Sequence, residues 1–85
     1  MKIQARVEDL GGRSKSVWVS KRGHVGDAEF RWPQDVRICF ADGETYCAAG
    51  SFDRSGPLHP SDGKITAGSP CHEALVMAGY SLEPA

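Results

Sequence analysis

A short helix near the end of the chain, predicted over residues Pro70 to Ala78, constrains the fold more than any other feature. Ser69 can cap it, because a serine oxygen accepts a hydrogen bond from a backbone N–H of the first turn. Pro70 suits the first helical position, and Gly79 supplies the left-handed residue that ends a helix. A helix this short is not stable alone in water. It must therefore pack against another element.

Two alternating segments at the start of the chain are predicted to form the first hairpin of a sheet. Polar and apolar residues alternate from Lys2 to Glu8 and again from Ser14 to Arg22, which is typical of half-buried strands. Leu10 to Arg13 between them has the composition of a turn. On the second of these strands, Trp18 faces away from the neighbouring valines. The sequence leaves open whether Trp18 and Trp32 lie in the core or on the surface.

A second hairpin is predicted around Asp42-Gly43, a dipeptide that favours the positive φ angles of a tight turn. It joins Val36–Phe40 to Glu44–Ala49. A two-residue turn puts Cys39 and Cys47 on opposite faces, whereas a three-residue turn with a bulge puts them on the same face. The sequence leaves both registers open.

The remaining segments complete a small α+β fold. Lys64 to Ala67 is predicted as a short strand, whereas Gly23 to Asp35 and residues 50–63 are rich in turn-forming residues and are predicted to be loops. We predict a single domain over residues 1–85, with a small antiparallel sheet of four to five strands in two hairpins and one C-terminal helix packed on one face. The residues predicted to form the buried face of the helix follow helical spacing: Cys71, Ala74, Leu75 and Ala78.

The composition excludes disordered and membrane-spanning chains. Hydrophobic residues make up 40% of the sequence and charged residues 25%, and residues 1–6 lack the apolar stretch of a signal peptide. The cysteines are three, an odd number that favours reduced thiols over a disulfide framework. We therefore expect a soluble protein of the cytoplasm. So small a core leaves homodimerisation open.

Basic and aromatic residues concentrate in the first part of the chain. Residues 1–37 hold eight Lys or Arg against five Asp or Glu, whereas residues 38–85 hold two against six. We predict a partner-binding surface in this cluster, because Trp, Tyr and Arg anchor protein interfaces and because opposite charges steer association. Its candidate members are Lys15, Trp18, Lys21, Arg22, Arg31, Trp32, Arg37 and Tyr46.

The leading functional hypothesis is a non-enzymatic protein-binding module without cofactor or metal. Small inhibitors and accessory proteins of phages and mobile elements, including anti-CRISPR proteins, share this format. The first alternative is a nucleic-acid-binding domain, because the N-terminal hairpin combines cations with aromatic rings. The isoelectric point near 6.3 is low for that class.

The second alternative is a small enzyme that uses the loop over residues 50–63. There His59 could act as a general base beside Asp62. Cys71 at the start of the helix could act as a nucleophile, although its position on the buried face favours packing. The cysteines and histidines lack the close pairs of a zinc site, and no glycine motif for phosphate is present.

Overall fold

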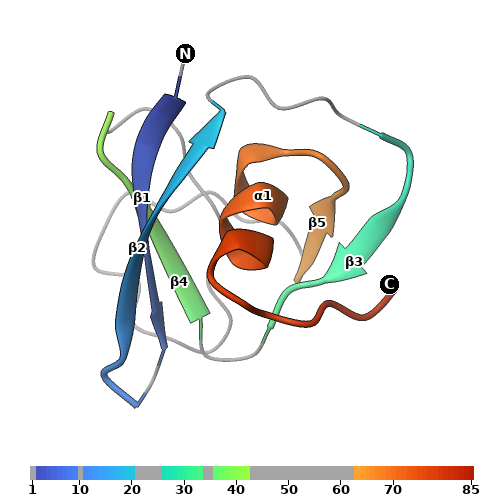
Figure 1. Ribbon diagram of the computed structural model, residues 1–85. Helices are drawn as coiled ribbons and strands as arrows, with labels where there is room; N and C mark the ends of the chain where they lie inside the picture. The colour runs from blue at the N-terminus through green and yellow to red at the C-terminus, as the bar shows by residue number, and fades with distance from the viewer. Residues whose placement is uncertain (1, 10, 21–25, 34–35, 43–62) are drawn as a thin grey trace.

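The computed structural model describes residues 2–9, 11–20, 26–33, 36–42 and 63–85, and it confirms the α+β fold (Figure 1). The described strands form two antiparallel sheets rather than one, and the helix lies between them. In chain order the elements are β1 (Lys2–Asp9), β2 (Ser14–Ser20), β3 (Glu29–Arg31), β4 (Val36–Phe40), β5 (Lys64–Thr66) and α1 (Pro70–Met77).

The larger sheet has the strand order β2-β1-β4. Its first two strands form the predicted hairpin, with Gln4 opposite Trp18 and Ala5 opposite Val17. The third strand pairs antiparallel with β1 on its other side. Because side chains alternate along each strand, one face of this sheet is apolar and buried, whereas the other carries polar side chains and Trp18.

The smaller sheet consists of β3 and β5, with Phe30 opposite Ile65. The end of the chain runs along the other edge of β3, where the Arg31 N–H donates to the Glu83 carbonyl at 2.8 Å. The predicted short strand at β5 is confirmed. The prediction that residues 23–35 are loop is wrong at β3, where the sequence also allowed a short strand or a helical turn over residues 28–32. The strand is held by residues far along the chain, which local pattern does not reveal.

The helix begins and ends at the predicted signals. The Ser69 Oγ accepts from the His72 N–H at 3.2 Å. At the other end Gly79 has a φ of 96°, and the Tyr80 N–H donates to the Leu75 carbonyl at 3.0 Å. This last bond is the one that defines a Schellman ending.

The core lies between the apolar face of the larger sheet, α1 and the smaller sheet. Trp32 is part of it, and its indole Nε1–H donates to the Val36 carbonyl at 2.8 Å. On the helix, Ala74 and Leu75 of the predicted face are completely buried. Among the described residues, the buried side chains are Ala5, Val7, Val17, Val19, Trp32, Val36, Ile38, Phe40, Ile65, Ala74 and Leu75.

The cysteines correct one expectation from the sequence. Cys71 is disulfide-bonded, and its partner is not among the described residues. Cys39 on β4 has a free thiol. The expectation of reduced thiols throughout is therefore wrong at Cys71. Disulfides persist mainly in oxidising compartments, so this bond weighs against the cytoplasmic location, which stays a prediction.

Two predicted segments lie outside the described residues. These are the strand Glu44–Ala49, with the register of its hairpin, and residues 50–62 of the predicted long loop. Within the described part of the chain, no helix is long and apolar enough to cross a membrane.

Candidate functional site

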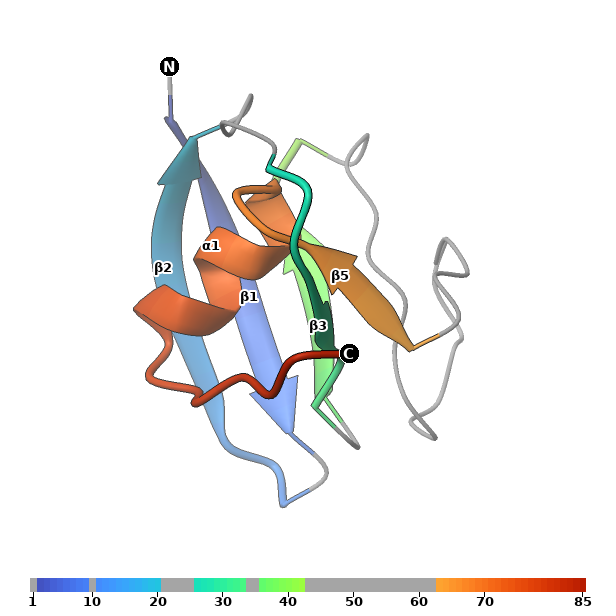
Figure 2. The same ribbon diagram turned by 90° about the vertical axis from the view of Figure 1, so that its right-hand side faces the viewer.

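The outer face of the larger sheet lies opposite the face on which α1 packs (Figure 2). Most of its described side chains are polar, and none of them is buried, which is the usual character of a solvated sheet face. Alternation from the buried positions assigns this face Lys2, Gln4, Arg6 and Glu8 of β1, Ser14, Ser16, Trp18 and Ser20 of β2, and Arg37 and Cys39 of β4.

Trp18 is the large apolar side chain on this face. It is 55% exposed and lies opposite Gln4 on the neighbouring strand. A tryptophan fixed on a strand has few rotatable bonds and a large surface, so it gains much from being covered and loses little freedom. These properties make Trp18 a candidate anchor for an interface.

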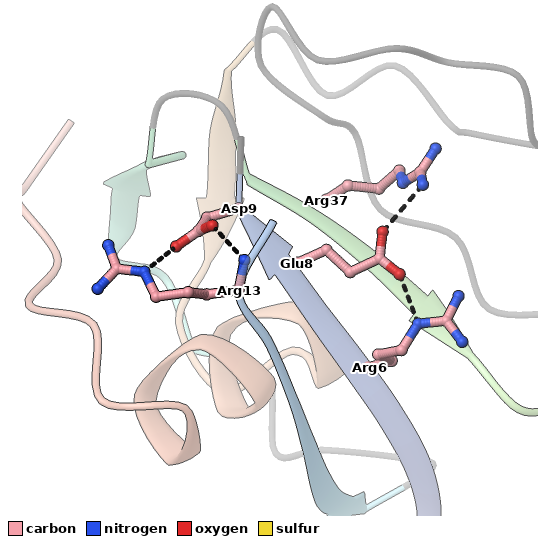
Figure 3. A network of polar contacts seen from close by, with 5 residues as sticks. All are labelled: Arg6, Glu8, Asp9, Arg13 and Arg37. Carbon is pink, nitrogen blue, oxygen red and sulfur yellow. Dashed lines mark hydrogen bonds and ion pairs between the residues drawn. The ribbon is translucent and has the colours of Figure 1, made fainter. Parts of the chain in front are cut away.

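The charges of the outer face are organised around Glu8 (Figure 3). Its carboxylate accepts from Arg37 Nη2 at 2.9 Å and from Arg6 Nε. The hydrogen bond from Arg37, assisted by that from Arg6, holds the pKa of Glu8 below its ordinary value despite partial burial. The hydrogen bond to Glu8 also raises the pKa of Arg6. Both arginines are therefore partly neutralised by one carboxylate.

The outer edge of β2 is not paired with any described strand. On β1, the Gln4 carbonyl accepts from the Ala41 N–H at 2.9 Å, so Gln4 directs its backbone groups toward β4. The direction of the N–H and C=O groups alternates along a strand. Gln4 and every second residue after it on β1 therefore form non-hydrogen-bonded pairs with the residues opposite them on β2. Their N–H and C=O groups point away from β1 and form the surface that we name the β2 edge: Ser14, Ser16 and Trp18.

The helix borders the β2 edge and runs antiparallel to it (Figure 2). At one end, Glu73 Oε2 accepts from the Ser20 N–H at 3.1 Å, so the last outward donor of β2 is already occupied. At the other end, Ala78 lies near Lys15. Met77, one turn after Glu73 on the same helix face, is 50% exposed. An extended chain lying on the β2 edge would have this helix face at its side.

A pocket of about 640 Å³ opens where the β2 edge begins, between the β1–β2 turn and the end of α1. In its wall, Asp9 accepts from Arg13 Nε at 3.1 Å and from the Arg13 backbone N–H at 2.9 Å (Figure 3). Lys15 makes no ion pair with a described residue. Burial, with a smaller contribution from Asp9, raises the pKa of Tyr80 above its ordinary value.

The predicted cluster is dispersed by the fold. Trp18 and Arg37 share the outer face but lie on strands separated by β1, and Lys15 lies on the other face of β2 in the pocket. Arg31 belongs to the smaller sheet. Trp32 is only 7% exposed, so its ring cannot belong to a binding surface of the folded chain. Three predicted residues lie outside the described part of the chain: Lys21, Arg22 and Tyr46.

Sequence reasoning missed three contributors to this region, Arg6, Glu8 and Met77. The alternation of β1 already put Arg6 and Glu8 on the face of Trp18, so that signal was present. Met77 lies one turn after the Glu73 that bonds to Ser20, and this placement depends on how α1 crosses the sheet, for which the sequence carries no local signal.

The catalytic hypotheses gain no support from the described residues. Cys71 is disulfide-bonded, so it offers no thiolate. His72 beside it stacks on Phe30 with ring centroids 5.0 Å apart, and its Nδ1 accepts from the Gly68 N–H at 3.0 Å. His59 and Asp62 lie outside the described residues. No three His, Cys, Asp or Glu side chains of the described part are placed to share a metal ion.

Comparison of the chain with protein-family models, with curated proteins and with solved structures finds no match.

Proposed function

We propose that this protein is a non-enzymatic binding module that receives an extended segment of another protein on the β2 edge. The proposal is carried by the row of outward N–H and C=O groups at Ser14, Ser16 and Trp18, which lack a strand partner among the described residues. An extended peptide satisfies such groups by adding a strand to the sheet. Binding of this kind suits a small inhibitor or accessory protein, such as those of phages and mobile elements.

Trp18 supplies the anchor of the proposed interface. A residue of the added strand that hydrogen-bonds to Trp18 directs its own side chain to the same outer face. There it meets an indole that is 55% exposed. Cross-strand pairs with an aromatic ring contribute roughly 0.2–1 kcal/mol each. The main-chain hydrogen bonds would therefore hold the added strand, and Trp18 would favour partners with a suitable side chain opposite its ring.

Charge favours a protein partner over nucleic acid. Phosphate contact needs cations that are free to replace counterions, whereas Arg6 and Arg37 both pair with Glu8. Binding of single strands also uses several exposed rings. Of the two tryptophans, Trp32 is buried and only Trp18 is exposed.

The test removes one outward N–H from the β2 edge. Peptides are selected from a displayed random library against the wild-type protein, and the affinity of a synthetic copy is then measured for two variants. Ser16→Pro deletes the outward N–H and leaves the β1–β2 hydrogen bonds in place, whereas Ser16→Ala keeps it. We expect Ser16→Pro to weaken binding at least ~10-fold, about 1.4 kcal/mol, and Ser16→Ala to bind like the wild type.

A second arm changes the peptide and does not depend on how Ser16→Pro folds. N-methylation at successive peptide positions should abolish binding only at alternate positions, whose N–H groups face the β2 edge. Equal affinity of the two Ser16 variants, or a loss of binding that does not alternate, would overturn the proposal. Retention of the wild type on immobilised DNA without any selected peptide would favour the nucleic-acid alternative.

A further inference from the structure

The pocket at the start of the β2 edge is lined by Lys15, beside the place that a bound strand would take. Resting on the proposed function, we propose that this segment carries an Asp or Glu whose carboxylate pairs with Lys15, in the pocket between the β1–β2 turn and the end of α1.

The register of a strand pair selects the position of this acidic residue. Lys15 lies between Ser14 and Ser16 and points to the face of β2 that also carries Val17. A strand added to the β2 edge hydrogen-bonds at Ser14 and Ser16, so the residue between those contacts lies opposite Lys15 on the same face. Such a non-hydrogen-bonded pair has the closest side chains of an antiparallel ladder.

The charges of the pocket favour a carboxylate at that position. The Arg13 guanidinium is bonded to Asp9 at 3.1 Å, whereas the ammonium of Lys15 has no ion-pair partner among the described residues. Tyr80 lines the same pocket, and its neutral hydroxyl is a potential hydrogen-bond donor. A volume of about 640 Å³ leaves room for an Asp or Glu side chain.

The next inward position of the bound strand meets an apolar surface. It lies opposite Val17. The helix that borders this edge bonds to Ser20 through Glu73, and Met77, one turn after Glu73, is 50% exposed. An apolar side chain there would cover Met77. In the antiparallel pairing that places a residue directly opposite Lys15, the segment runs from Val17 toward Lys15, so its apolar residue precedes its acidic residue by two positions.

Lys15 also argues against a second copy of this chain as the occupant. A symmetric antiparallel pair that used Ser14, Ser16 and Trp18 of both copies would put each Lys15 opposite Val17 of the other. The two lysines would then be diagonal neighbours on one face, where like charges repel. An inward-pointing lysine is a common protection of an edge strand against pairing with itself. The same residue favours a partner that carries the opposite charge.

The experiment repeats the peptide selection with Lys15→Glu and with Lys2→Glu, which makes the same charge change at an exposed residue of β1. We expect wild type and Lys2→Glu to enrich Asp or Glu at one peptide position, and Lys15→Glu to enrich Lys or Arg there. Replacing the acidic residue of a selected peptide by its amide should weaken binding to the wild type ~5- to 10-fold. The same replacement should have no effect with Lys15→Gln, which lacks the charge.

The outcomes separate this inference from the proposed function. Peptides that depend on the Ser16 N–H but show no acidic preference would overturn the role of Lys15 and leave strand addition intact. Lys15 would then act only as a cation near the C-terminal end of α1, where positive charge is favourable, and Lys15→Gln would lower stability without changing peptide choice. Absence of any peptide that depends on the Ser16 N–H would overturn both proposals.

Discussion

Glu8 is the residue that links the two arginines of the outer face. One carboxylate holds Arg37 on β4 and Arg6 on β1, and the side chains of Glu8 and Arg37 are only 19% and 20% exposed. Their bond is thus better shielded from solvent than a pair at the rim of a protein. It joins two strands that are far apart in sequence, so its loss should measurably lower the free energy of unfolding.

Glu8→Gln should remove a pH-dependent part of that stability. Because the folded protein lowers the pKa of Glu8, the carboxylate stabilises the fold above its unfolded pKa of about 4.3. That stabilisation disappears as the pH falls through the lower folded value. Between pH 7 and pH 3 we expect the wild type to lose about 1 kcal/mol more than Glu8→Gln, measured by urea unfolding at each pH.

The control for Glu8 is Glu83→Gln, which removes an exposed carboxylate without an ion pair among the described residues. It should keep the pH dependence of the wild type. If Glu8→Gln also kept that dependence, the account of the Arg6–Glu8–Arg37 network would be wrong.

The two tryptophans show what could be predicted for single residues. Trp18 lies between Val17 and Val19 on an alternating strand, so its place on the face opposite those valines followed from the sequence, whereas its position in the core or on the surface did not. Trp32 follows a short strand whose partners lie far along the chain, and nothing local identified its ring as part of the core. Both tryptophans were assigned to one candidate surface because basic and aromatic residues concentrate in this part of the chain. Such a concentration does not show whether a ring points to the core or to solvent.

At the scale of elements, α1 and the first hairpin were predictable because their signals are local. The caps of α1 lie within a few residues of its ends, and the hairpin follows from alternation around one turn. The division into two sheets was not predictable, because pairing of β3 with β5 depends on contacts between distant segments. The free edge of β2 was hidden for the same reason, since it depends on which strands become neighbours.

Gly79 tests the account of how α1 ends. Its φ is 96°, and a Cβ added there would have no atom within 4 Å, so any cost of Gly79→Ala comes from backbone conformation alone. We expect Gly79→Ala to lower the free energy of unfolding by about 1 kcal/mol. Gly79→Asn should cost less, because asparagine tolerates the left-handed region. Equal stability of Gly79→Ala and the wild type in urea unfolding would contradict a Schellman ending.

At the scale of the whole molecule, a thin core is reinforced by a covalent bond at the start of α1. Cys71 lies next to the cap and packs at the margin of the core. A disulfide stabilises a fold largely by restricting the unfolded chain, and small domains gain most from such restriction. The stability of the protein should therefore depend strongly on whether its surroundings are oxidising or reducing.

Reduction should lower the thermal unfolding midpoint of the wild type by several degrees. A loss of about 2 kcal/mol corresponds to roughly 10 °C in a domain of this size. Cys71→Ser should unfold at the lower temperature with or without reductant. Cys39→Ser, which removes the free thiol, should respond to reductant like the wild type. A wild-type midpoint unchanged by reductant would show that the bond does not contribute.

The central claim is that β2 offers an open edge to another strand, and amide hydrogen exchange tests it most directly. In the free protein, the Ser16 and Trp18 amides should exchange fast, whereas those of Val17 and Val19, which face β1, should exchange slowly. Saturation with a selected peptide should make Ser16 and Trp18 slow as well. Slow exchange at Ser16 and Trp18 before any peptide is added, or fast exchange there in the complex, would contradict strand addition at β2.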